Sequence, residues 1–191
     1  MEELEKKRCF GWLDSPLMMR YHDEEWDVPI HDDRPPFESL ALQSAQAGLS
    51  WQTILRKRDN FRRAFSNFEV TRVTAYGEAD RQRLLSDSGI VRNRQKIDAI
   101  ISNAQCFLQI QEEFGSFDRY IWQFTDHKTL RRPDMLTFEN IPARTEKSEA
   151  ISGDLKRRGF RFVGPTICYA FMQVTGMVNG HLSICFRSPK N

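Results

Sequence analysis

Two pairs of cysteine and histidine near opposite ends of the chain carry the residue types that bind zinc. Twelve residues separate Cys9 from His22, and three separate His181 from Cys185. At the second spacing, a histidine and a cysteine lie on one side of a helical turn and can converge on one ion. Two sulfurs and two imidazoles would complete a tetrahedral shell with no open position, so the ion would be structural. The alternative is a surface pair and two unrelated residues, because the two halves are far apart in sequence.

Aromatic and polar side chains are dense in two further segments, YHDEEW at 21–26 and QAGLSW at 46–51. A base flipped out of a duplex needs stacking surfaces and polar groups that contact its edge, and both segments offer them. For Trp51 the competing interpretation is an ordinary core aromatic. The chain shows no Ser-His-Asp arrangement and no phosphate-cradling glycine loop, so neither triad hydrolysis nor nucleotide binding gains support.

A short glycine-bearing turn, SGIVRN at 88–93, stands between a predicted helix over 79–87 and another from residue 94 onward. Such a turn presents backbone N–H groups at a helix N-terminus, where phosphate binds well. We interpret it as a helix-hairpin-helix that grips DNA without contacting its bases, although an ordinary helical corner fits the same pattern. The candidate DNA contacts are Gly89, Arg92, Arg94 and Lys96.

The elements that must position these residues are helical. Apolar positions recur at helical spacing over 96–111, and further helices are predicted over 37–47, from Ser50, over 148–158, and from Pro165 to Gly176. Phe68 to Val73 alternates like a strand, but one isolated strand cannot make a sheet. The stretch 128–144 is expected to be an irregular connection. The predicted fold class is therefore all-α, in two helical lobes.

Composition bounds the class of protein. The chain has 191 residues, 40% of them hydrophobic, which suits one domain or two very small ones. Its mean hydropathy of -0.57 and the lack of any run near ~20 apolar residues argue against a membrane protein. The first residues lack the apolar core of a secretory signal, so we expect a soluble cytoplasmic protein.

Charge is informative only locally, because the net charge is +2. Basic residues gather in three runs, any one of which is ordinarily a solvated helix face; together they indicate a phosphate-facing surface. The runs are Arg56, Lys57, Arg58, Arg62 and Arg63; Arg92, Arg94 and Lys96; and Lys156, Arg157, Arg158 and Arg161.

Taken together, these segments resemble the 3-methyladenine DNA glycosylase I (Tag) family. The resemblance runs from residue 8 to about 186 and in family order. It rests on RC at 8–9, YHDEEW at 21–26, AQAGLSW at 45–51, TILRKR at 53–58, GIVR at 89–92 with KI at 96–97, GF at 159–160, FVGPTICY at 162–169, and Asn179, His181 and Cys185.

The resemblance implies a helix-hairpin-helix glycosylase fold whose termini are joined by one structural Zn²⁺ per chain, held by Cys9, His22, His181 and Cys185. It implies a base pocket in which Trp51 stacks on the alkylated adenine and Tyr21 lines the wall. It also implies a monofunctional enzyme of base excision repair that hydrolyses the N-glycosidic bond of 3-methyladenine, without a lysine Schiff base or a catalytic aspartate. The expected partner is double-stranded DNA containing alkylated adenine, bound by a monomer.

The expected domain organisation is a single glycosylase unit over 1–191. Its middle helices, about 37–125, contain the hairpin, and its terminal lobe comprises about 8–36 and 145–186.

One departure from the family bears on the chemistry. The family's pocket carboxylate is a glutamate at the position of Gln43, and Ser44 follows where glycine is usual. Glu38 lies five residues earlier, about 140° around a helix axis, so we do not expect it to replace that carboxylate. We therefore assign base contact and catalysis to Tyr21, Gln43 and Trp51, with a neutral amide in place of the charge.

Smaller departures are Gly180, where the family usually has aspartate, and an extra residue between Cys9 and Trp12; both could loosen the surroundings of the metal. Because of Gln43, two other interpretations stay open. One is a relative with altered base preference, and the other is a non-enzymatic module that binds DNA or lesions. A base pocket at Tyr21 and Trp51 favours an enzyme, because a pure duplex binder has no use for one.

Overall fold

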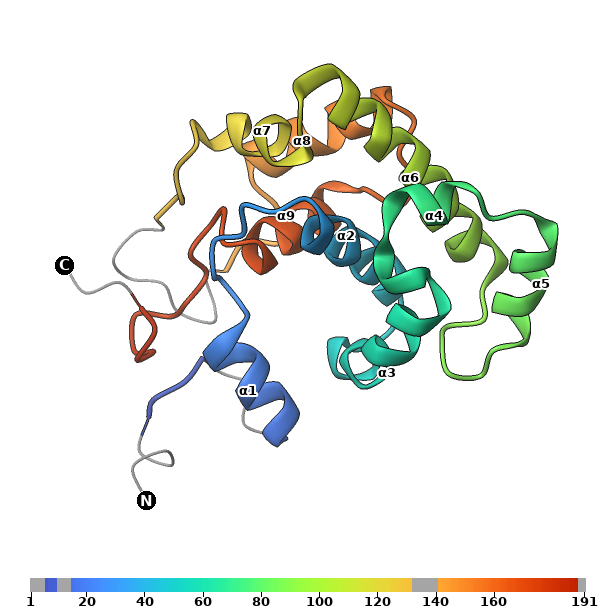
Figure 1. Cartoon of the computed structure of the whole chain (residues 1–191). Helices are drawn as coiled ribbons and strands as arrows, with labels where there is room; N and C mark the ends of the chain where they lie inside the picture. Colours follow the sequence, from blue (N-terminus) through green and yellow to red (C-terminus); the bar gives the residue numbers. More distant parts are fainter. Residues whose placement is uncertain (1–5, 10–14, 132–140, 189–191) are drawn as a thin grey trace.

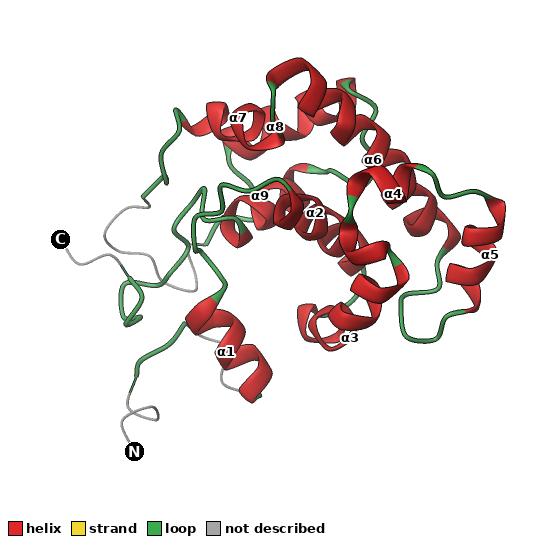
Figure 2. Ribbon diagram, in the orientation of Figure 1, coloured by secondary structure: helices red, strands yellow, loops and turns green. Residues whose placement is uncertain are grey.

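The computed structural model describes residues 6–9, 15–131 and 141–188, and within these ranges the regular structure is helical apart from one isolated bridge between Leu130 and Val178. The helices are α1 (Pro16–Glu24), α2 (Arg34–Gln46), α3 (Trp51–Ala64), η2 (Ser66–Phe68), α4 (Val70–Thr74), α5 (Glu78–Ser86), α6 (Arg94–Phe114), α7 (Phe117–Trp122), η3 (Gln123–Thr125), α8 (Glu146–Arg157) and α9 (Pro165–Val174). The all-α prediction is confirmed for the described residues (Figure 2).

The predicted helix starts have identifiable caps. The Ser50 hydroxyl accepts a hydrogen bond from the backbone N–H of Thr53 at 3.2 Å, so α3 begins at Trp51. Pro165 occupies the first turn of α9, where its missing N–H costs nothing. The side chain of Asn93 caps α6 in the same way as Ser50 caps α3.

Other boundaries differ from expectation for local reasons. The alternating residues at 68–73 are helical, because Val70 and Val73 bury the same face of α4 and no partner strand exists among the described residues. α8 begins before Ser148, because Thr145 is the N-cap and the Ser148 hydroxyl accepts from the Thr145 N–H at 2.8 Å. Within the predicted irregular stretch 128–144, residues 132–140 lie outside the described residues.

α2 and α9 lie side by side at the centre of Figure 1, with α8 packed against α9, and with α3 and α6 packed against α2. The main hydrophobic core runs from Phe37 on α2 to Val178 after α9, and residues of both predicted lobes contribute to it. None of the described helices is long and apolar enough to cross a bilayer.

α1 stands at the edge of the molecule, on the side where both termini lie (Figure 1). It belongs to a second, smaller cluster made of Cys9, Tyr21, Trp26, Leu55, Leu182 and Cys185. The segment after α1 runs along the end of α9, where a Cβ at Gly176 would lie 2.3 Å from the backbone nitrogen of Pro29. Only glycine permits this approach, and Gly176 also has φ +69. The fold therefore brings both chain ends to one place.

Candidate metal cluster, aromatic pocket and hairpin

The four predicted metal ligands meet between the chain ends. Cys9 precedes α1, His22 lies on α1, and His181 and Cys185 follow α9. All four are buried, and their ligand atoms lie within 4.8 Å of one another. The Cys9 Sγ is 3.5 Å from the His181 Nδ1. The Cys185 Sγ is 3.5 Å from the His22 Nε2 and 3.6 Å from the His181 Nδ1.

These distances fit a tetrahedral ion. Bond lengths of about 2.3 Å to sulfur and 2.0–2.1 Å to nitrogen place tetrahedral sulfur and nitrogen ligands about 3.5–3.6 Å apart. The three sulfur–nitrogen distances above match that value. The cluster can therefore hold a metal ion with four protein ligands, and such a shell leaves no open position for substrate.

Each imidazole directs its other nitrogen toward a carboxylate. The His22 Nδ1 lies 2.8 Å from the Asp23 Oδ1, and the His181 Nε2 lies 3.8 Å from the Asp27 Oδ2. Asp23 in turn accepts hydrogen bonds from the Arg8 guanidinium at 2.6–3.0 Å. Burial alone would raise the pKa of Asp23, but the hydrogen bonds from Arg8 and His22 outweigh it and lower that pKa. The negative carboxylate holds His22 with its Nε2 lone pair toward the cluster.

The pKa values of the two buried thiols are shifted in opposite directions. Hydrogen bonding to Cys185 raises the pKa of Cys9, and burial adds to this rise. The bond that Cys185 accepts from Cys9 lowers the pKa of Cys185, and the two histidines lower it further. These hydrogen bonds favour the thiolate form of Cys185, which is the form of cysteine that binds metals.

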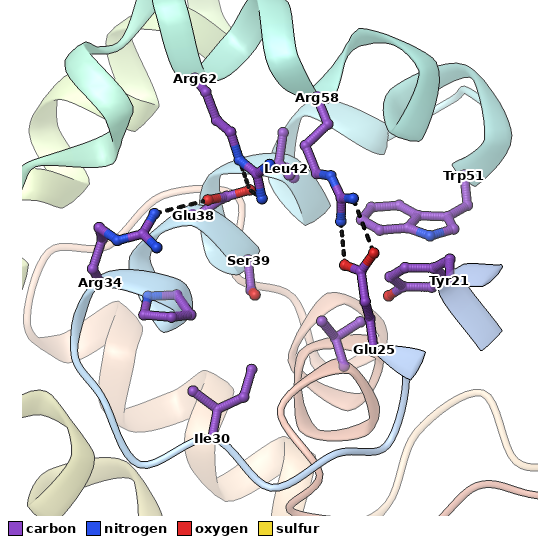
Figure 3. Close-up of a pocket in the computed structure, with 12 residues that line it drawn as sticks. Tyr21, Glu25, Ile30, Arg34, Glu38, Ser39, Leu42, Trp51, Arg58 and Arg62 are labelled. Atoms are coloured by element: carbon purple, nitrogen blue, oxygen red, sulfur yellow. Dashed lines mark hydrogen bonds and ion pairs between the residues drawn. The ribbon is translucent and has the colours of Figure 1, made fainter. Parts of the chain in front are cut away.

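Tyr21 and Trp51 form an aromatic pair at the edge of a cavity of about 130 Å³ (Figure 3). Their ring centroids are 5.5 Å apart and their planes are inclined at 51°. Trp51 is the first residue of α3, and the Ser50 cap fixes its backbone. Burial raises the pKa of Tyr21, so its hydroxyl stays protonated and does not act as a base. The structure brings together the two aromatic residues singled out from the sequence.

Two ion pairs cross the cavity from α3 (Figure 3). Arg58 binds the carboxylate of Glu25 at the end of α1 through both of its terminal nitrogens. Arg62 binds the carboxylate of Glu38 on α2 at 2.8 Å, and Arg34 lies 3.5 Å from the same carboxylate. The expectation that the basic run at 56–63 faces phosphate is therefore wrong for Arg58 and Arg62, because carboxylates neutralise them.

Gln43 does not line this cavity, although it is buried at 4% exposure. The residues that α2 contributes to the lining are Arg34, Pro35, Glu38, Ser39 and Leu42. Sequence reasoning set Glu38 aside because it lies about 140° around the helix from Gln43. That rotation carries Glu38 into the described cavity, so its carboxylate is a pocket residue that sequence reasoning missed. The assignment of base contact to Gln43 stays a prediction.

The structure accommodates two departures from the family pattern, Ser44 and Gly180, and the third, between Cys9 and Trp12, lies outside the described residues. Ser44 is fully buried, and its hydroxyl donates to two backbone carbonyls at 2.8 and 3.2 Å. The Gly180 N–H donates to the carboxylate of Asp27, and a Cβ at this position would lie 2.5 Å from the Gln173 Nε2. An aspartate here would require Gln173 to move.

The predicted hairpin is present, with residues 87–93 joining α5 to α6. Lys57 and Asn60 on α3 donate to its backbone carbonyls, and a Cβ at Gly89 would lie 3.0 Å from the Asn60 amide. Arg92 and Arg94 are exposed, and Arg94 pairs with Glu78 at 3.4 Å. The hairpin is thus fixed to α3 while its arginines face solvent.

Lys96 corrects the list of DNA contacts. Its side chain is 8% exposed, and its ammonium donates to the backbone carbonyls of Ala45 at 2.9 Å and Ala47 at 2.6 Å. The Lys96 ammonium therefore binds the end of α2 and does not face solvent, where DNA phosphates would lie. A basic residue in a sequence does not reveal which acceptor its side chain reaches.

The chain is similar to known proteins over nearly its whole length. The family model described as methyladenine glycosylase matches residues 12–188. The DNA-3-methyladenine glycosylase 1 of Escherichia coli K12 is 45% identical over 186 residues, covering 97% of this chain and 98% of that protein. A crystal structure of 3-methyladenine DNA glycosylase I (TAG) has 45% identity and a TM-score of 0.92, covering 96% of this chain and 100% of that one. A structure of the Staphylococcus aureus glycosylase, described as showing the basis of 3-methyladenine recognition, has 33% identity and a TM-score of 0.91, covering 96% of this chain and 97% of that one.

The contact between Asp23 and His22 predicts an effect on metal affinity. Replacing Asp23 with alanine removes the carboxylate that orients the imidazole, and losses of such partners typically cost 10–100-fold. We expect the affinity for Co²⁺, measured by its visible absorption on titration, to fall by about that factor. Glu24→Ala, an exposed neighbour on α1, is the matched control and should leave the affinity unchanged. Equal affinities for the two variants would show that Asp23 does not support the cluster.

Proposed function

The chain belongs to the methyladenine glycosylase family, and from that premise we propose that it hydrolyses the N-glycosidic bond of 3-methyladenine in alkylated DNA. The observation that carries the proposal is the Tyr21–Trp51 pair, which borders a cavity in a chain similar to glycosylases over nearly its whole length. Aromatic faces bind a flipped base by stacking, and they attract a cationic ring more strongly than a neutral one.

The chemistry required of the protein is modest. Methylation at N3 leaves the nucleotide cationic, so the base departs as a neutral molecule. Water adds its oxygen to C1′ of the deoxyribose, the bond between C1′ and N9 breaks with its electron pair going to the base, and the water proton is released. The enzyme must mainly select, flip and hold the base.

The residues that line the cavity fit a mechanism in which the protein binds the base and the labile bond supplies the reactivity. Glu25 and Glu38 are each bound to an arginine, so neither is a free general base. Tyr21 stays protonated because burial raises its pKa. These residues therefore shape and polarise the pocket, and the labile bond supplies most of the reactivity.

Base release is the direct test. Methylated DNA incubated with the protein should yield free 3-methyladenine, resolved from other bases by chromatography. Trp51→Ala should lose about 1–3 kcal/mol of stacking on the flipped base. Phe114→Leu, at the end of α6, is the control, because Phe114 packs on the main core and does not line the cavity. If the parent protein releases no base at all, the chain is a non-enzymatic relative.

Gln43 supports a second candidate, a glycosylase with altered base preference, because the amide replaces a family carboxylate. If Gln43 contacts the adenine edge, Gln43→Glu restores a charge-assisted hydrogen bond and raises excision of 3-methyladenine by about 10-fold. Rates for 3-methyladenine and other alkylated bases should be compared in both proteins. An unchanged rate in Gln43→Glu together with a large loss in Trp51→Ala would show that Gln43 does not contact the flipped base. Because the two changes would touch one base, their effects need not add.

We further propose that the four-residue cluster holds one structural Zn²⁺. Thiolate and imidazole ligands at these distances suit zinc, and an ion joining both chain ends adds folding free energy directly. Elemental analysis of protein purified without added metal should find one zinc per chain. His181→Ala should lose the ion and lower the melting temperature, whereas the exposed His127→Ala should do neither. Metal-free protein of unchanged thermal stability would contradict the proposal.

For the hairpin, we propose contact with the phosphates of double-stranded DNA. Arg92→Ala together with Arg94→Ala should weaken binding to all duplexes alike. The slope of log affinity against log salt should decrease by about 0.9 for each phosphate that the variant no longer binds. Arg119→Ala, an exposed position on α7 outside the three basic runs, removes a similar charge and should leave the slope unchanged. The same slope in the double variant and the parent would count against this surface.

A further inference from the structure

Lys96 connects the two parts of the molecule that must act together on a flipped base. It lies in the first turn of α6, directly after the hairpin, and its own N–H is capped by the Asn93 side chain at 3.1 Å. Its ammonium reaches across to α2 and binds two backbone carbonyls. The side chain is thus a link between the hairpin and the end of α2.

The two carbonyls that accept from Lys96 lie at the C-terminal end of α2, where a positive charge is stabilising. α2 ends at Gln46, and the last carbonyls of a helix lack intrahelical partners and carry the negative end of its dipole. Ala45 lies in that last turn, and Ala47 is the C-cap. Burial lowers the pKa of Lys96, and the hydrogen bonds to the two carbonyls hold its side-chain nitrogen at the end of α2. Its short contacts therefore fix the backbone at residues 45–47.

The fixed backbone leads directly into the aromatic pair. Gly48 has φ +79, the Leu49 N–H donates to the Gln46 carbonyl at 2.6 Å, and Ser50 caps the helix that begins with Trp51. The turn from Ala47 to Trp51 is short, and each residue in it has a defined conformation or hydrogen bond. A shift of the carbonyls held by Lys96 would therefore reach the Trp51 ring.

We propose that Lys96 is a positioning residue that ties the 47–51 turn, and with it Trp51, to the DNA-facing hairpin. Its consequence for excision rests on the proposed function. Lys96 would set the distance between phosphates held at the hairpin and the ring that stacks on the flipped base. Its removal would impair base excision without weakening attachment to duplex DNA, which is the opposite of the expectation for Arg92.

The test compares Lys96→Met with Arg92→Ala. Methionine has a similar unbranched length but no donor, so the turn loses both hydrogen bonds. We expect hydrogen exchange in a peptide spanning 47–55 to accelerate, and single-turnover release of 3-methyladenine to fall about 10-fold. Affinity for undamaged duplex and its salt dependence should stay as in the parent. Arg92→Ala should weaken duplex binding and leave exchange at 47–55 unchanged.

Several results would overturn the proposal. A reduced duplex affinity and salt slope with unchanged exchange would make Lys96 a phosphate contact. A lower melting temperature with unchanged exchange and unchanged excision per folded molecule would make it only a stabilising residue. If Lys96→Met does not fold, Lys96→Gln, whose shorter amide cannot span both carbonyls, takes its place with the same criteria. A parent protein without base release would refute the proposed function, whereas the exchange measurement would still decide whether Lys96 fixes the turn.

Discussion

The arrangement of the pocket depends on the cluster of two cysteines and two histidines that joins the chain ends. α1 has only nine residues, and its buried side chains are Tyr21 and His22. A helix this short is not stable by itself, and its apolar side chains Leu17, Met18 and Tyr21 pack into the smaller cluster and not into the main core. The contact of His22 with Cys185 therefore holds α1 in place, and the adjacent residue, Tyr21, is held with it against Trp51.

Polar contacts outside the cluster also hold the helix ends next to the aromatic pair. Arg58 ties the end of α1 to α3 through Glu25, and Ser50 fixes the start of α3. Lys96 fixes the end of α2, just before the turn that leads to Trp51. The aromatic pair therefore lies between three helices whose termini are held by charged or capping groups. Such contacts have fixed directions, and they place side chains more strictly than apolar packing alone.

Helices leave local signals in the sequence, whereas the spacing of cysteine and histidine marked only candidate ligands, and the family resemblance joined the four into one site. Apolar spacing and capping residues mark α3, α6 and α9, and cysteine with histidine in polar surroundings marks a ligand set. α1 was not predicted, because its apolar residues Leu17, Met18 and Tyr21 fall within nine residues and are too few to show a helical period. The charged residues were harder to interpret. Arg58, Arg62 and Lys96 have the same basic character in sequence as Arg92, but a carboxylate or carbonyl reached only in the folded chain decides their role. The same applies to Glu38, because helix geometry gives its rotation about α2 but not the position of the cavity.

The most direct test of this account is hydrogen exchange measured across the whole chain, before and after a chelator removes bound metal. If the cluster holds the pocket together, α1 (Pro16–Glu24) and residues 181–188 lose protection, while α2, α6 and α9 in the main core keep theirs. Unchanged protection of α1 in metal-free protein would contradict the claim that the cluster holds the aromatic pocket together. Loss of protection throughout the main core would contradict the separation of the two hydrophobic clusters.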